Sequence, residues 1–199
     1  LGYSDANSAT VASFFTALAY ILPIAGGYIA DRSLGKFRTI IYFAIPYILG
    51  HIILGTFDSN VGLYVALALL AGGSGTIKPN VSTLKGLMYQ KEGKSHLLSQ
   101  AFSWFYMAIN IGATLGPLLC GLLAQLYGWH VGFGAAALFI FFGLLTYLAG
   151  YRHLPARVER GKQESRKLTR AEWMRIGAIC AVMTITIFQS VAYFQSFNT

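Results

Sequence analysis

The sequence predicts an all-α membrane protein with six transmembrane helices, and composition, window length and the absence of strand alternation support this prediction. Of its 199 residues, 55% are hydrophobic and only 11% are charged, a balance that soluble domains rarely show. A helix needs about 20 mostly apolar residues to cross the hydrocarbon core of a bilayer. Six windows reach that length, and none alternates polar and apolar residues as a barrel strand does.

The six predicted spans cover residues 8–30, 39–57, 61–84, 102–127, 131–151 and 176–197. We expect residues 1–151 to form most of an N-terminal helical bundle, residues 152–172 a basic cytoplasmic linker, and residues 173–199 the first helix of a second bundle. Thr169, with Glu172 three residues later, matches a capping box and predicts the start of the last helix. The chain is therefore expected to be a fragment of a larger fold.

The formal charge of +8 reports topology and not a nucleic-acid partner. Of the 15 Lys and Arg residues, 14 fall in segments 32–38, 85–94 and 152–175, and none falls in the connections 58–60 and 128–130. With spans that alternate in direction, every basic segment lies on one side, which the positive-inside rule identifies as the cytoplasm. The predicted location is a cell membrane, as a multi-pass protein in the lipid bilayer.

Proline and glycine occur at membrane depth more often than a simple anchor needs. The prolines are Pro23, Pro46, Pro79 and Pro117. Such breaks free backbone carbonyls and permit bending. Gly112 and Gly116 form a small-xxx-small pair, which predicts close approach of a neighbouring helix. Helix packing alone accounts equally well for each of these residues.

Lys78 is the only charged side chain well inside a predicted span, where it costs about 2.5–3.5 kcal/mol on insertion scales. It either reaches the cytoplasmic interface along its methylene stem or faces a wet cavity. Side chains lean toward the helix N-terminus, which is outside for this span, and this favours the cavity. Small or polar residues at Ala71, Gly75 and Ser82 share its face and indicate the same. Because all seven acidic residues lie in loops or at span edges, its anionic partner is expected to be the substrate or to lie outside this chain.

Tyr20 and Asn110 are predicted to lie in the same layer as Lys78. Counted at about 1.5 Å per residue, Tyr20 is about 15 Å, Asn110 about 12 Å and Lys78 about 9–15 Å from the cytoplasmic ends of their spans. A phenol, a carboxamide and an ammonium together suit a zwitterion with an amide backbone. The alternative is that Tyr20 and Asn110 each make an ordinary hydrogen bond between helices.

No catalytic constellation is visible, so the chain is not expected to be an enzyme. The glycines before Lys78 do not form a phosphate-binding loop, because proline follows the lysine and no strand precedes them. His51 is interpreted as structural because no second histidine or carboxylate accompanies it. Cys120 and Cys180 lie inside spans and are interpreted as packing residues. We expect no cofactor, no metal ion and a monomeric protein.

Three strings resemble the proton-dependent oligopeptide transporter family of the major facilitator superfamily. They are YILPIAGGYIADRSLGKFRTI from Tyr20, GGSGTIKPNVSTLKGLMY from Gly72 and FSWFYMAINIGATLGP from Phe102. The resemblance places the chain at family helices two to seven. It implies a proton-coupled symporter that imports di- and tripeptides by alternating access.

The resemblance also implies roles for particular residues. Lys78 would hold the peptide carboxylate and couple to protonation, and Tyr20 and Asn110 would meet the peptide backbone. The superfamily's loop between helices two and three, which latches the cytoplasmic side, is matched by Gly27, Asp31, Arg32, Gly35, Lys36 and Arg38. Positive-inside charge alone accounts for the basic members of that loop.

Two other functions fit the same residues: proton-coupled transport of nitrate or another small anion, and a peptide-binding receptor that does not transport. The sequence departs from the family at Phe194, where many members carry a glutamate. The family's acidic and arginine motif on the first helix would precede Leu1. The predicted linker is shorter than in relatives that insert two extra helices.

Overall fold

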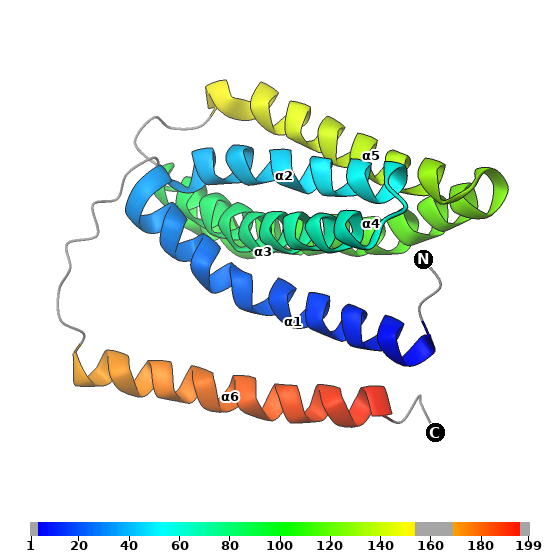
Figure 1. The fold of residues 1–199 in the computed structure, drawn as a ribbon. Coiled ribbons are helices and arrows are strands. Elements are labelled where there is room, and N and C mark those ends of the chain that lie inside the picture. The colour runs from blue at the N-terminus through cyan, green and yellow to red at the C-terminus, as the bar shows by residue number, and fades with distance from the viewer. Residues whose placement is uncertain (1–3, 154–168, 196–199) are drawn as a thin grey trace. The chain divides into compact units, whose positions relative to one another are not determined.

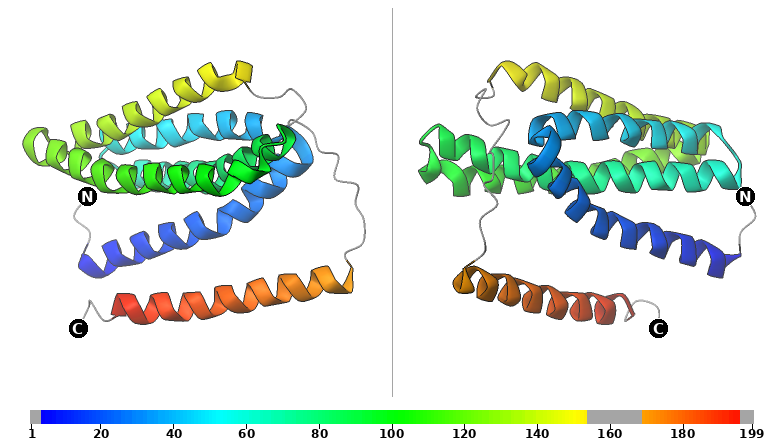
Figure 2. Two further views of the ribbon diagram at one scale, coloured as in Figure 1. Left: turned by 180° about the vertical axis from the view of Figure 1, so that it is seen from behind. Right: turned by 60° about the vertical axis from the view of Figure 1, so that its left-hand side comes forward.

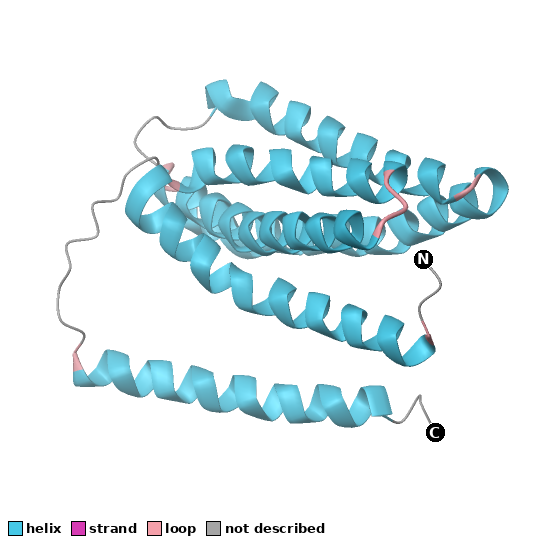
Figure 3. Cartoon of the chain, in the orientation of Figure 1, coloured by secondary structure: helices cyan, strands magenta, loops and turns pink. Residues whose placement is uncertain are grey.

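The chain is helical in nearly all of residues 4–153 and 169–195, which are the residues described by the structure, a computed structural model. Figure 3 shows that short loops connect the helices in these ranges. In chain order the elements are α1 (Asp5–Ile29), η1 (Ala30–Leu34), α2 (Lys36–Thr56), α3 (Asn60–Lys91), η2 (Ser95–Leu97), α4 (Leu98–Tyr127), α5 (Trp129–Ala149), η3 (Gly150–His153) and α6 (Arg170–Gln195).

Five of these segments are long and apolar enough to cross a membrane: Ala6–Leu34, Lys36–Thr56, Asn60–Lys91, Ser95–Tyr127 and Trp129–Ala149. They correspond to the first five predicted spans, and the sixth coincides with α6, a single helix of 26 residues. The predicted end of the third span at residue 84 is too early for the helix, since α3 continues to Lys91. The added residues include leucine, methionine, glutamine and lysine, which favour helix outside the apolar window. All four prolines at membrane depth lie inside helices that continue past them.

The chain divides into two compact units, residues 1–162 and residues 163–199. In the second unit the backbone N–H of Thr169 donates to Glu172 Oε2 at 2.8 Å, and the Glu172 N–H donates to Thr169 Oγ1 at 3.3 Å. The predicted capping box is therefore confirmed. The division into a bundle, a linker and a further helix stays a prediction, because most of the predicted linker falls on residues 154–168, which lie outside the described residues.

The long helices of the first unit do not pack in chain order. Helix α3 packs against both α1 and α2, α2 also packs against α5, and α5 packs against α4. The series α1, α3, α2, α5, α4 can be followed in Figures 1 and 2. Although α3 and α4 are consecutive, they make few contacts with each other. The two helices that carry Lys78 and Asn110 are therefore not closed against one another along their length.

The basic segments of the first unit gather at one end. Figure 1 shows that the α1–α2 connection, the α3–α4 connection and the end of α5 lie at the same end of this unit. We call this the basic end, because segments 32–38 and 85–94 lie there and hold six Lys and Arg residues. The connections without Lys or Arg, at 57–59 and 128, lie at the opposite end. The helix directions predicted from charge are confirmed for this unit.

Small residues let α3 approach its neighbours closely. A Cβ added to Gly73 would come within 2.9 Å of Tyr47 Cα on α2, and one added to Gly26 of α1 would lie 2.7 Å from Thr76 Cα. The prediction for Gly112 and Gly116 is wrong for the described part of the chain, where a Cβ at either position meets nothing within 4 Å. The close packing glycines are on α1, α2 and α3, at positions without that spacing motif.

Candidate functional site

Lys78 projects from the middle of α3 and is exposed in this unit. Among the described residues the ion pairs are Lys36 with Asp31 and Lys94 with Glu92, and neither includes Lys78. The predicted stripe on its face is split. Ala71 and Gly75 are buried, and a Cβ on Gly75 would lie 3.1 Å from Leu22 of α1, so these two residues form a helix contact. The interpretation of the whole stripe as a cavity wall is wrong for Ala71 and Gly75, and Lys78 alone faces outward as an ammonium.

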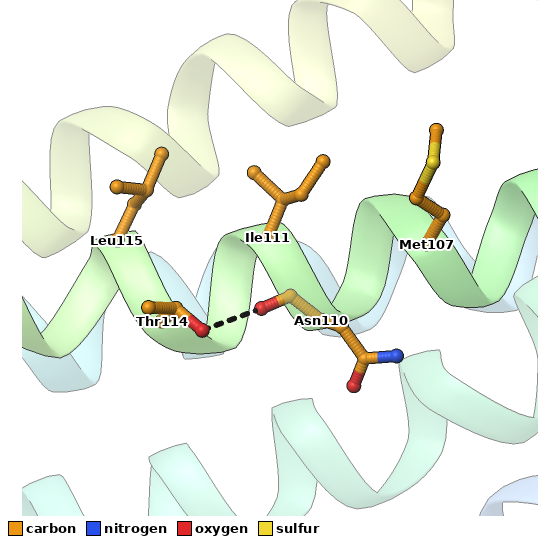
Figure 4. Close-up of a pocket in the computed structure, with 5 residues that line it drawn as sticks. All are labelled: Met107, Asn110, Ile111, Thr114 and Leu115. Carbon is orange, nitrogen blue, oxygen red and sulfur yellow. Dashed lines mark hydrogen bonds between the residues drawn. The ribbon is translucent and has the colours of Figure 1, made fainter.

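Tyr20 and Asn110 are also exposed, on α1 and α4, and Tyr20 is 80% accessible. Asn110 is one of five α4 residues that line an open groove of about 610 Å³. Figure 4 shows its side-chain amide pointing away from the groove residues Met107, Ile111 and Leu115. The Thr114 hydroxyl donates to the backbone carbonyl of Asn110 at 3.0 Å, which leaves the Asn110 side-chain amide available to a ligand.

The contacts between α1 and α3 fix the relative depth of Tyr20 and Lys78. The two helices run in the same direction, with Gly75 opposite Leu22 and Asn80 opposite Gly26. Lys78 is therefore opposite the turn after Pro23, about five residues or ~7 Å nearer the basic end than Tyr20. Since lysine leans toward the N-terminus of its helix, its ammonium reduces this offset.

Asn110 lies at a comparable distance from the basic end. From Asn110 to the start of α4 is about 18 Å, and from Lys78 to the end of α3 about 20 Å, at ~1.5 Å per residue. No hydrogen bond joins Tyr20, Lys78 and Asn110 within residues 4–153. What the structure brings to one level is thus a phenol, an ammonium and a carboxamide with their polar atoms accessible.

Comparison with known proteins identifies the chain. The family model described as "PTR2: POT family" matches residues 37–198. This chain belongs to the POT family. A di-/tripeptide transporter of Lactococcus lactis subsp. lactis (strain IL1403) is 38% identical over 166 residues, which is 83% of this chain and 32% of that protein. The uncharacterized transporter YclF of Bacillus subtilis (strain 168) is 39% identical over 147 residues, or 74% of this chain and 30% of the relative.

The fold agrees with that of solved POT structures. A mutant of peptide transporter POT, in complex with alafosfalin, shares 37% identity with this chain at a TM-score of 0.69. The alignment covers 90% of this chain and 36% of that structure, so the chain spans about a third of the proteins it matches. The predicted fold class, an all-α multi-pass membrane protein, is confirmed. The matched proteins are named as transporters and not as enzymes.

The predicted POT loop motif is assembled at the basic end. Helix α1 ends in η1, a π-helical turn, and Gly35 then takes φ 76° and ψ 152° before α2 begins. This turn brings Asp31 and Lys36 together, with Lys36 Nζ 2.5 Å from Asp31 Oδ1. Arg32 lies over the Tyr28 ring, with Cζ 5.9 Å from its centroid.

The other two motif residues make no such contact within the described chain. Arg38 is exposed on the first turn of α2. Gly27 lies in α1 with open space at its missing Cβ. The motif is therefore built around one ion pair, between Asp31 and Lys36, and one cation–π contact.

Sequence reasoning missed Asn80, the residue that connects the site's helices most directly. Its side chain is 1% exposed and donates to Gly26 O on α1 at 3.4 Å and to Thr76 O at 2.8 Å. The signal was available, since a carboxamide inside an apolar span needs a partner. The remaining prediction, at Phe194, concerns a side chain outside the described ones. No cluster of three or more metal-binding side chains is found in the described ranges.

Proposed function

We propose that this chain is part of a proton-coupled symporter that imports di- and tripeptides by alternating access. The proposal follows from membership of the POT family and from relatives named as di-/tripeptide or peptide transporters. It extends to the whole protein what those relatives' names say of them. Peptides and protons would be its cargo, and the lipid bilayer its surroundings.

The observation that carries the proposal is the exposed ammonium of Lys78, at membrane depth and outside both described ion pairs. A charged group at that depth is stable only beside water or a counterion. The carboxylate of a short peptide supplies such a counterion. The Asn110 amide can donate to and accept from a peptide bond, and the Tyr20 hydroxyl can do the same.

Proton movement would supply the driving force. One charge crossing about 100 mV yields roughly 2.3 kcal/mol, enough for about fifty-fold accumulation before a pH gradient is added. Lys78 would take part by pairing with the peptide carboxylate or with a protein carboxylate that changes its protonation. Neither Asp31 nor Glu92 fits that role, because both pair with other lysines at the basic end.

The test uses the full-length protein reconstituted in liposomes with an inward proton gradient. Labelled dialanine uptake should be concentrative and abolished by a protonophore. Lys78→Ala should abolish proton-driven uptake, whereas Lys94→Ala, which removes an exposed lysine beside Glu92, should leave it near the wild-type rate. Wild-type, pH-dependent uptake by the Lys78→Ala protein would refute the role of Lys78.

The same assay separates the rival functions. Nitrate that competes with dialanine for uptake, at concentrations where chloride does not, would indicate an anion carrier. Saturable dialanine binding with no flux under any gradient would indicate a receptor. Either result would replace the peptide-symport proposal.

A further inference from the structure

Lys85 is a second lysine on α3, and its surroundings differ from those of every other described basic residue. It lies seven residues after Lys78, so both project from the same face of the helix. Its Nζ is 4.7 Å from the ring centroid of Phe102 and 4.5 Å from that of Phe105. The same ammonium donates a hydrogen bond to the backbone carbonyl of Ala101. Lys85 is partly buried by these groups.

All three contacts of this ammonium reach across to the first two turns of α4. Phe102 and Phe105 stand nearly perpendicular, at 83°, with their centroids 6.4 Å apart, so the lysine meets the faces of two rings that also touch each other. Gly86, the next residue on α3, leaves room for the Phe102 ring, which lies 4.0 Å from its missing Cβ. We call the group Lys85, Ala101, Phe102 and Phe105 the α3–α4 clasp.

The clasp matters because α3 and α4 have few other contacts. Lys78 lies about 10 Å along α3 from Lys85, and Asn110 lies about 7–13 Å along α4 from the three α4 members. Both distances run from the basic end toward the middle of the unit. Moving the start of α4 relative to α3 would therefore change the separation between Lys78 and Asn110. A positive-inside charge alone would not need two aromatic rings and a carbonyl.

We propose that Lys85 is a positioning residue of the peptide site, which sets the spacing between Lys78 and Asn110 through the α3–α4 clasp. This inference rests on the proposed function. Lys85 itself contacts no substrate in this arrangement, since its ammonium is already held by protein groups. Its effect on binding passes through the two helices that it joins.

The test compares dialanine binding by the purified full-length protein and its variants. Lys85→Met keeps the length of the side chain and removes the ammonium. It should raise the Kd for dialanine about ten-fold, or ~1.4 kcal/mol. Lys85→Arg should restore binding, because a guanidinium stacks on aromatic faces and still donates to a carbonyl. Lys94→Met, the matched loss of a lysine just beyond α3, should leave the Kd unchanged.

A double-mutant cycle distinguishes positioning from a general loss of structure. If Lys85 acts by placing Asn110, then Lys85→Met should have almost no further effect on the Kd in the Asn110→Ala background. Equal effects of Lys85→Met in both backgrounds would overturn the inference. So would a wild-type Kd for Lys85→Met, or a failure of Lys85→Arg to restore binding.

Two further controls keep the outcome interpretable. If Lys85→Met does not fold, the Phe102→Leu/Phe105→Leu variant removes both ring faces, keeps apolar side chains and should raise the Kd in the same direction. A wild-type Kd for that variant would overturn the inference. If the wild-type protein itself binds no dialanine, the proposed function has failed, and this result differs from all those that concern Lys85.

Discussion

The side-chain amide of Asn80 on α3 donates a hydrogen bond to the backbone carbonyl of Gly26 on α1, at 3.4 Å. The same amide donates to Thr76 O at 2.8 Å, so one buried side chain joins two helices and one of its own turns. Because Asn80 is two residues from Lys78, this contact also fixes the level at which the lysine faces its surroundings. It supports the site without contacting a substrate.

Replacing Asn80 should destabilise the protein. Asn80→Ala removes both hydrogen bonds and leaves a small void, and we expect a loss of about 1–3 kcal/mol in the free energy of unfolding. Thermal unfolding in detergent measures the effect. Asn110→Ala is the matched control, since that residue is exposed and its loss should change stability by about 0.5 kcal/mol or less. Equal unfolding temperatures for the two variants would contradict this role for Asn80.

Gly73 and Gly72 are neighbours for which the same substitution should have opposite effects. A Cβ on Gly73 would collide with Tyr47 of α2, whereas one on Gly72 meets nothing within 4 Å. Gly73→Ala should therefore cost about 1–3 kcal/mol through overpacking. Gly72→Ala should be neutral or stabilise α3 by up to about 1 kcal/mol, because alanine is the better helix former. Denaturation of the two purified variants side by side tests the α2–α3 contact; a more stable Gly73→Ala protein would rule it out.

Gly35 should tolerate no other residue. Its φ of 76° with ψ of 152° lies in a region that is essentially restricted to glycine, and not in the left-handed helical region that asparagine tolerates. Gly35→Ala and Gly35→Asn should both lower stability by about 1–3 kcal/mol. Gly27→Ala, in the same motif but with helical backbone and open space, should have little effect. Unfolding curves provide the comparison, and rescue by asparagine would show that the backbone at residue 35 is different.

Tyr20 should contribute to peptide affinity through its hydroxyl. Tyr20→Phe keeps the ring and removes one hydrogen-bonding group, so the KM for dialanine uptake should rise about five-fold, as expected for a bond worth ~1 kcal/mol. Tyr42→Phe makes the same change at another exposed tyrosine, on α2, and should leave the KM unchanged. A rise in KM for both variants, or for neither, would argue against a specific role for Tyr20.

The sequence was sufficient for features that depend on composition and charge, and insufficient for those that depend on which helix faces which. The first five spans and their directions followed from apolar length and from the placement of Lys and Arg. The capping box at Thr169 followed from two residues with the right spacing. The spacing motif at Gly112 and Gly116 misled because it reports only that close packing is possible, while the neighbour of a helix is a tertiary property.

The basic residues illustrate the same limit within the site. Lys78 could be singled out because it lies deep within an apolar window. Lys85 lies at the end of that window, where the positive-inside rule explains any lysine, so its contacts with Phe102 and Phe105 were not predicted. Asn80 was overlooked because it stands inside a string whose lysine drew the attention. Only the packing of α3 against α1 and α4 separates these three roles.

The length of α3 has a further consequence for how the protein sits in a bilayer. At ~1.5 Å per residue its 32 residues span about 48 Å, well beyond a hydrocarbon thickness of about 30 Å. Tilting removes only part of that excess, so the last turns, with Lys85 and Lys91, emerge among the lipid headgroups. There, phosphates compete with Ala101 and the two phenylalanine rings for the Lys85 ammonium. Lipid composition and bilayer thickness would thereby act on the peptide site from a distance.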